Sequence, residues 1–135
     1  MRKFLLMAVL LAFTACSDND VNSPSTASLV GTYNLVSVNG ATLPIVISQN
    51  PTTQLVSEQL TVTSDGMFTV TTTKRIVNTG DATQSTTFTE SGGGAVLVTG
   101  SATTFHFNGG NNATVSLSGN TLMVNTGSST SLYTR

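Results

Sequence analysis

Cysteine and histidine, the side chains best suited to nucleophilic, redox or metal chemistry, each occur once in this 135-residue sequence, as Cys16 and His106. His106 lies between Phe105 and Phe107, so in a strand whose phenylalanines face the core its imidazole points to solvent. A zinc-type site needs further His, Cys or acidic ligands, and none lies near His106 in the sequence. We therefore interpret His106 as a solvated strand residue and expect no metal site.

Other patterns that could carry catalysis are equally incomplete. The triplet Gly92-Gly93-Gly94 is followed by neither a Lys-Ser/Thr pair nor a helix, so we expect a flexible hairpin loop there rather than a phosphate-binding loop. Glu58 and Glu90 have the side chains that cleave glycosides, but nothing in the sequence places them together. The Gly-x-Ser-x-Gly motif of serine hydrolases does not occur. We predict no enzymatic activity and no cofactor.

The position of Cys16 indicates a different chemistry, the attachment of lipid. The basic stretch "MRK" is followed by ten apolar residues (4–13), too few for a bilayer span of about 20 residues but typical of an export signal. The residues "FTAC" (13–16) resemble the lipobox of bacterial lipoproteins. The resemblance implies that the thiol of Cys16 receives a diacylglyceryl group and that the chain is cut just before it. The alternative is an ordinary signal peptide cut after Ser17, which would discard Cys16.

The residues after the cysteine divide the chain into three parts. The stretch "SDNDVNSPSTAS" (17–28) is almost entirely polar and has the character of a solvated tether. We predict a lipoprotein signal peptide over 1–15, a lipidated cysteine with a disordered tether over 16–28, and one folded domain over 29–135. The expected partner of the N-terminus is the membrane, through the acyl chains.

The residue next to the cysteine bears on the location of the protein. In enterobacterial lipoproteins an Asp directly after the lipidated cysteine favours the inner membrane, so Ser17 implies the outer membrane. Asp18 and Asp20 resemble the acidic surface-export signals of some other lipoproteins. Whether the domain faces the periplasm or the cell surface stays open, and the oligomeric state is not assigned.

Composition favours an all-β domain and excludes nucleic acid as a partner. Charged residues make up only 8% of the sequence, against roughly 25% in an ordinary soluble domain, and the abundant Thr suits the half-buried surface of a sheet. Beyond the leader, three basic residues stand against six acidic ones. No basic stripe is present that would follow a phosphate backbone.

From Leu29 onward the sequence shows about nine short segments of alternating apolar and polar residues, separated by turns rich in Gly, Asn and Asp. The predicted strands are 31–38, 57–64, 67–77, 83–90, 95–99, 102–107, 113–117, 121–125 and 131–135. Such short connections predict antiparallel neighbours, and closure protects the strand edges. We therefore predict a single small antiparallel up-and-down β-barrel of about eight or nine strands. The segment 39–56 is too long for a turn. It is expected to hold a short extra strand or a lid in which Ile45 or Ile47 covers the barrel mouth.

One hairpin can be aligned from its turn. "TSDGM" (63–67) suits a type I turn with Gly66 in the left-handed conformation. Val62 then faces Phe68 and Glu58 faces Thr72, which puts the apolar residues of both strands on one face. Lys74 becomes a diagonal neighbour of Glu58. The two are expected to form either an exposed ion pair or a pair that orients the polar head of a ligand.

The segments "GTYNLVSVNGATLP" (31–44), "SDGMFTV" (64–70) and "SLYTR" (131–135) resemble small lipocalin-like domains of bacterial lipoproteins. The resemblance implies a calycin-type barrel. The expected function is that of a non-enzymatic, lipid-anchored envelope protein that binds a small apolar or amphipathic ligand in the barrel. The alternative is a structural or protein-interaction module with a filled barrel and no ligand. The candidate ligand contacts are Tyr33, Ile45, Ile47, Glu58, Phe68 and Lys74.

The first prediction concerns Cys16, which we expect to be acylated and to form the mature N-terminus. The intact mass of the protein from the membrane fraction reports the acyl chains directly, and the substitution Cys16→Ser should release the protein from the membrane. A soluble species that begins at Asp18 would contradict lipidation.

Overall fold

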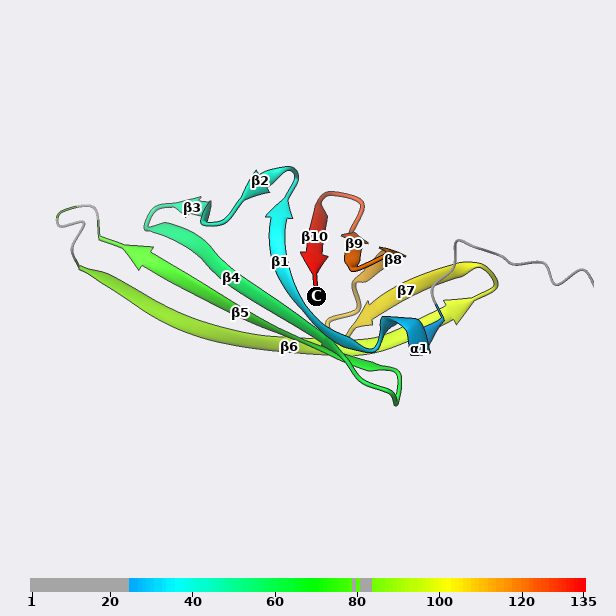
Figure 1. Cartoon of the computed structure of the whole chain (residues 1–135). Coiled ribbons are helices and arrows are strands. Elements are labelled where there is room, and N and C mark those ends of the chain that lie inside the picture. The colour runs from blue at the N-terminus through cyan, green and yellow to red at the C-terminus, as the bar shows by residue number, and fades with distance from the viewer. Residues whose placement is uncertain (1–24, 79, 81–83) are drawn as a thin grey trace, which may run out of the picture.

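The computed structural model of the chain describes residues 25–78, 80 and 84–135 (Figure 1). The predicted signal peptide, Cys16 and the predicted tether as far as residue 24 lie outside the described residues. The described residues form one helical turn and ten strands of a single antiparallel sheet. These elements are α1 (Thr26–Leu29), β1 (Gly31–Val38), β2 (Ala41–Thr42), β3 (Ile45–Gln49), β4 (Thr52–Val62), β5 (Met67–Val77), β6 (Ser85–Thr99), β7 (Ala102–Phe107), β8 (Asn112–Ser118), β9 (Thr121–Asn125) and β10 (Thr130–Thr134).

Eight of the strands close into a barrel. From β4 to β10 each strand pairs antiparallel with the next, and β1 completes the ring because it pairs with β10 on one side and with β4 on the other. The ladder between β1 and β4 covers only residues 31–34 and 59–62. The predicted antiparallel up-and-down barrel is therefore confirmed, with eight strands in the ring.

The long segment 39–56 forms the two remaining strands. β2 pairs with the end of β1, and β3 pairs antiparallel with the first half of β4. Of the two alternatives that the sequence left open for this segment, the structure shows extra strands that continue the sheet.

The outer parts of the long strands leave the barrel together as a flared sheet, which projects to the left in Figure 1. We call this part the extension. It consists of β3 and of residues 52–58, 71–77 and 85–91 of β4, β5 and β6.

The glycine triplet 92–94 was predicted to be a flexible hairpin loop, and this prediction is wrong. The triplet lies inside β6, a continuous strand of 15 residues that pairs with β5 in its first part and with β7 in its last part. A Cβ atom on Gly94 would lie 1.9 Å from the carbonyl oxygen of His106 on β7, and one on Gly93 would lie 2.5 Å from that of Phe68 on β5. Gly93 and Gly94 are required because neighbouring backbones approach too closely for a side chain.

The predicted hairpin between β4 and β5 is confirmed in register. Val62 faces Phe68 and Glu58 faces Thr72, and Gly66 has a φ of +80°. The carboxylate of Asp65 accepts hydrogen bonds from the Thr63 hydroxyl and from the Met67 N–H, which hold the pKa of this carboxyl below its ordinary value. The register changes beyond Glu58, where a bulge at residues 55–57 of β4 puts Leu55 opposite Lys74.

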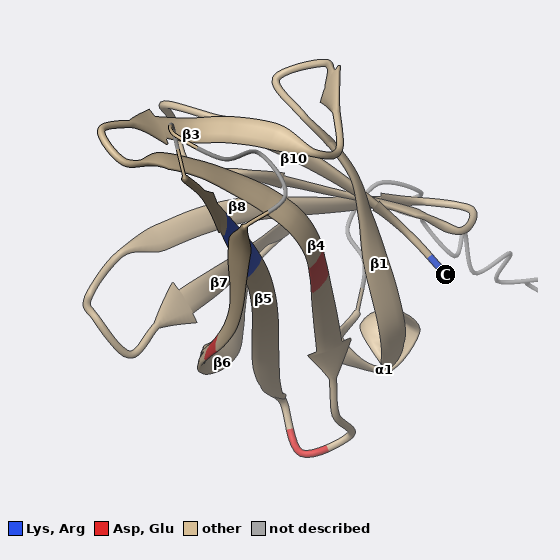
Figure 2. Cartoon of the chain, turned by 90° about the vertical axis from the view of Figure 1, so that its left-hand side faces the viewer, with Lys and Arg blue, Asp and Glu red and all other residues tan. Residues whose placement is uncertain are grey.

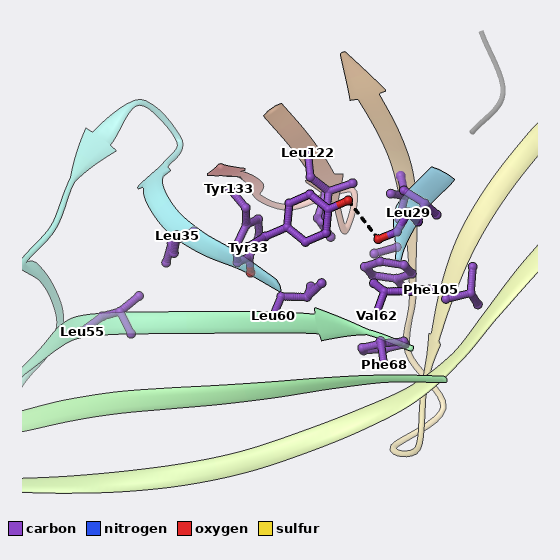
Figure 3. Close-up of a cluster of buried hydrophobic side chains, with 14 residues drawn as sticks. Leu29, Tyr33, Leu35, Leu55, Leu60, Val62, Phe68, Phe105, Leu122 and Tyr133 are labelled. Atoms are coloured by element: carbon purple, nitrogen blue, oxygen red, sulfur yellow. Dashed lines mark hydrogen bonds between the residues drawn. The ribbon is translucent and has the colours of Figure 1, made fainter. Parts of the chain in front are cut away.

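The barrel interior is filled by its own side chains. The buried cluster runs from Leu29 at the end near α1 through the barrel to Leu55, which lies in the extension (Figure 3). Near α1 the rings of Phe68 and Phe105 stack with their centroids 4.4 Å apart. The largest side chains with less than 2% of their surface exposed are Tyr33, Phe68, Phe105, Leu29, Leu60, Leu122 and Val62.

Because β7 approaches Gly94 closely, we expect an added methyl group to lower the free energy of unfolding at Gly94 but not at Gly92. Gly94→Ala should lower the free energy of unfolding by about 1–3 kcal/mol, as overpacking does, because the new Cβ meets the backbone of β7. Gly92→Ala is the matched control, because a Cβ there would meet nothing within 4 Å. Urea unfolding of the three proteins measures the difference, and equal midpoints for both variants would contradict the continuous strand.

Candidate functional site

Polar side chains gather on the inner face of the sheet where the extension leaves the barrel. The centre of the group is Glu58 on β4, whose carboxylate accepts a hydrogen bond from the Thr72 hydroxyl on β5 at 2.7 Å. The other carboxylate oxygen accepts one from the phenol of Tyr133 on β10 at 2.5 Å. Figure 2 shows how sparse charged residues are elsewhere on the described chain. We call Glu58, Thr72 and Tyr133 the mouth cluster.

Tyr133 links β10 to β4 across the intervening strand β1. Its side chain is only 4% exposed, and burial, reinforced by the charge and hydrogen bond of Glu58, raises the pKa of its phenol well above the ordinary value. The phenol therefore stays protonated and acts as a donor to Glu58 at every pH at which the protein is ordinarily handled.

Lys74 lies on the same face but does not pair with Glu58 as the sequence analysis expected. Because of the bulge in β4, Lys74 is opposite Leu55, and its ammonium group forms an ion pair with Glu90 on β6. Glu90 itself is opposite Thr72. The structure thus brings Glu58 and Glu90 onto one face, on either side of Thr72, although nothing in the sequence placed them together.

A depression of about 260 Å³, open to solvent, lies beside these residues at the point where β7 ends and β6 continues into the extension. Apolar and polar groups share its walls, which are formed by Val70, Thr72, Glu90, Ser91, Gly92 and Phe107. Such a lining can receive part of an amphipathic molecule, and its open shape leaves the rest of that molecule in solvent.

Two of the candidate ligand contacts lie elsewhere, in the packed end of the barrel. Tyr33 and Phe68 are 0% and 1% exposed, and neither lines the depression at the mouth. The Tyr33 phenol donates to the carbonyl oxygen of Leu29 at 2.9 Å and accepts from the Arg135 guanidinium at 2.9 Å. Burial raises the pKa of the Tyr33 phenol, although the charge of Arg135 opposes this shift. Tyr33 on β1 therefore links both Leu29 of α1 and Arg135 to β1 by hydrogen bonds.

The candidate residues from β3 differ in exposure. Ile45 is half-buried against the core, opposite Leu55 and on the same face as Lys74. Ile47 lies at a bulge of β3 and is 50% exposed. The structure thus brings Ile45, Glu58 and Lys74 together on the inner face of the extension.

His106 is exposed, as the alternation predicted, and its Nδ1 lies 2.5 Å from the side-chain oxygen of Asn112 on β8. Within residues 25–78, 80 and 84–135, no group of three or more His, Cys, Asp or Glu side chains is arranged to hold a metal ion.

Sequence reasoning did not place three residues, Tyr133 and Glu90 at the mouth and Arg135 at the packed end of the barrel. Closure of a meander puts its first and last strands side by side, and this general rule could have placed Tyr133 near β1. Glu90 could have been found by continuing the antiparallel register of β5 and β6 away from Thr72. The two cation contacts of Arg135 with Tyr33, a hydrogen bond and a ring contact at 5.2 Å, had no signal beyond the closing "SLYTR".

Comparisons with models of known protein families, with curated proteins and with solved structures found no match. The described part of the chain contains no helix that is long and apolar enough to cross a membrane.

The hydrogen bond between Tyr133 and Glu58 predicts both a loss of stability and a change in its pH dependence. Tyr133→Phe should lower the free energy of unfolding at pH 7 by about 1.5–3 kcal/mol, the range for a hydrogen bond to a charged group. Because the folded pKa of Tyr133 is raised, the unfolded chain loses this proton first, near pH 10, and stability falls as pH rises further. The variant should show a shallower fall above pH 10.

Urea unfolding at pH 7 and at pH 10.5 measures both effects. Glu58→Gln keeps an acceptor for the phenol and removes the charge, so a double-mutant cycle with Tyr133→Phe isolates the pair. If the free energy of unfolding of Tyr133→Phe fell between pH 7 and pH 10.5 by as much as that of the unsubstituted protein, the raised pKa of Tyr133 would be contradicted.

Proposed function

We propose that this chain is a lipid-anchored, non-enzymatic protein of the bacterial cell envelope whose lipocalin-like barrel serves as a structural or protein-interaction module. The observation that carries the proposal is the filled interior. An eight-stranded barrel is just wide enough to be filled by side chains or to hold one small ligand, and here the buried cluster extends from Leu29 to Leu55.

The polar groups of the interior also favour a module without a ligand. Among the described residues, every buried side-chain nitrogen and oxygen has a hydrogen-bond partner. Ligand pockets usually present polar groups that fix the orientation of the ligand. In this barrel the carboxylate of Glu58 is already engaged by two donors of the same chain.

The anchor and the family assignment rest on the sequence features and on the topology. The export signal followed by "FTAC" supports lipidation at Cys16, and Ser17 supports the outer membrane. The closed eight-stranded meander that begins with Gly31-x-Tyr33 supports the lipocalin-like assignment. The short apolar leader supports export of the domain to the periplasmic or outer face of the envelope.

One observation favours a second function, the binding of a small amphipathic molecule at the mouth. The open depression of about 260 Å³ is lined by Thr72 and Glu90 next to Val70 and Phe107. An apolar tail could lie along Val70 and Phe107 while its polar head contacts the Lys74–Glu90 pair. Ile45 would then bound the same face.

A titration with a fluorescent fatty-acid-like probe separates the two functions. The full chain carrying Cys16→Ser, which removes the acyl anchor, should give no saturable rise in fluorescence, because its barrel is filled. In the ligand reading the probe binds, and Lys74→Ala and Ile45→Asp both weaken uptake. Ile47→Asp is the control for Ile45→Asp, because Ile47 is already half exposed. Saturable uptake that Lys74→Ala reduces would overturn the interaction module in favour of ligand binding.

A further inference from the structure

The first part of β6 is an open strand edge. β5 pairs with β6 from Ser85 to Ala95, whereas β7 pairs with it only from Gly94 to Thr99. The last contact on the β7 side is a hydrogen bond from the Asn108 N–H to the Gly93 carbonyl at 3.0 Å. Within the described residues, no strand lies beside positions 85–92 on that side, as the lower rim of the extension shows (Figure 1).

The alternation of an antiparallel strand fixes which backbone groups face the open side. The N–H and C=O of one residue point to the same side, and those of the next residue point to the other. Because the carbonyl of Gly93 points toward β7, the backbone groups of Ser91, Thr89, Thr87 and Ser85 do so as well. Among the described residues these groups have no strand partner, so they form a row of donors and acceptors that can serve as a template for a further strand.

This edge lacks the protection that the opposite edge of the extension has. β3, the strand at the other edge, is five residues long and contains a bulge at Ile47. The β6 edge contains no Pro, no Lys and no register shift along its ladder with β5. Its one charged residue, Glu90, is neutralised by Lys74 of the same chain, so the edge does not repel a second copy of itself.

We propose that two copies of the chain pair antiparallel through this edge, with the two-fold axis at Phe88, so that the two extensions form one continuous sheet. In this register the Phe88 residues face each other, Glu90 faces Thr86 of the second copy, and Thr87 faces Thr89. On the inner face the aromatic pair of Phe88 residues has a Glu90–Thr86 pair on either side, so each Glu90 faces an uncharged residue. On the outer face each Thr87 faces a Thr89, so hydroxyl groups pair with hydroxyl groups. Pairs of both kinds stabilise antiparallel ladders.

The two registers whose axes lie nearer the glycines are less favourable for identifiable reasons. An axis at Glu90 would place two carboxylates opposite each other. An axis at Thr89 would extend the ladder to Gly93, whose carbonyl is already bonded to Asn108, and would put Phe88 opposite Glu90. An axis at Phe88 uses residues 85–91 and stops before the glycines that β7 approaches.

This pairing makes a second copy of the chain the partner of the proposed interaction module. It rests on that proposed function, because the lipid anchor is what makes the pairing effective. A single ladder over residues 85–91 involves far fewer residues than the roughly 20–30 per side of a stable interface. Dimerisation is therefore concentration-dependent in solution. Anchors that confine both copies to one membrane raise their effective concentration.

Cysteine cross-linking of the full chain in cells tests the register. At a two-fold axis through Phe88 the two Cα atoms are about 4.5 Å apart, as in a non-hydrogen-bonded pair, so Phe88→Cys should form a disulfide dimer with a mild oxidant. In the same register two Thr89→Cys side chains are diagonal neighbours about 7–8 Å apart, so this variant is the matched control and should remain monomeric. The unsubstituted chain controls for Cys16.

The non-covalent dimer is tested with purified full chain that carries Cys16→Ser, by sedimentation over a range of concentrations. Phe88→Lys places two cations opposite each other and should weaken self-association at least about tenfold. Thr89→Pro removes an N–H that points to the open edge and should act in the same direction without removing a bond to β5. Thr71→Lys, on the exposed face of β5, is the charge-matched control and should leave association unchanged.

Three outcomes would overturn the pairing. These are a monomer at every concentration, equal cross-linking of Phe88→Cys and Thr89→Cys, and capture of either cysteine variant mainly by a different protein. Loss of the membrane anchor alone would abolish cross-linking in cells but leave the concentrated Phe88→Cys/Cys16→Ser protein able to form the disulfide. A failure of the proposed anchoring is therefore distinguishable from a failure of the pairing.

Discussion

The limited length of the ladder between β1 and β4 determines most other features of this fold. β1 gives only residues 31–34 to β4 before its hydrogen bonds turn to β2. The first half of β4 is thereby free to pair with β3 and to leave the ring together with β5 and β6. The mouth cluster lies where these strands part, because Glu58 directly precedes the last four residues of β4 that pair with β1. The barrel and the extension both arise because β4 pairs along its length with β5, and on its other side with β3 in its first half and with β1 in its last four residues.

The parts of the structure that the sequence predicted well are those determined locally. The hairpin around Gly66 was correct because a turn residue and the apolar pattern of two adjacent strands point to the same register. The Glu58–Lys74 pair was wrong because one extra residue at the bulge changes which side chains are neighbours beyond it. The hairpin loop at the glycine triplet was predicted wrongly, because a sequence does not distinguish a glycine in a turn from one, such as Gly94, that allows a neighbouring backbone to approach. Tyr133 and Glu58 meet only after the ring has closed, across 75 residues of chain.

With its interior filled, the described chain offers a partner backbone and hydroxyl groups rather than a cavity. Few charges are available for steering, and the one ion pair among the described residues joins β5 to β6 within the chain. The outer face of the extension presents Thr71, Thr87 and Thr89, all exposed. Recognition by such a surface depends on geometry, that is, on strand direction and register, more than on electrostatic attraction.

Closure by β1 also has a consequence for the order in which the chain folds. The strands from β4 to β10 pair with their neighbours in sequence, whereas the ladder of β1 with β10 joins Asn34 to Thr134. The entropic cost of closing a loop rises with its length, and contacts between distant residues slow folding. We therefore expect the meander to form first as an open sheet and the ladder between β1 and β10 to form last. Until that step the edges of both strands are exposed, so we expect the chain to be most prone to aggregation just before its ring closes.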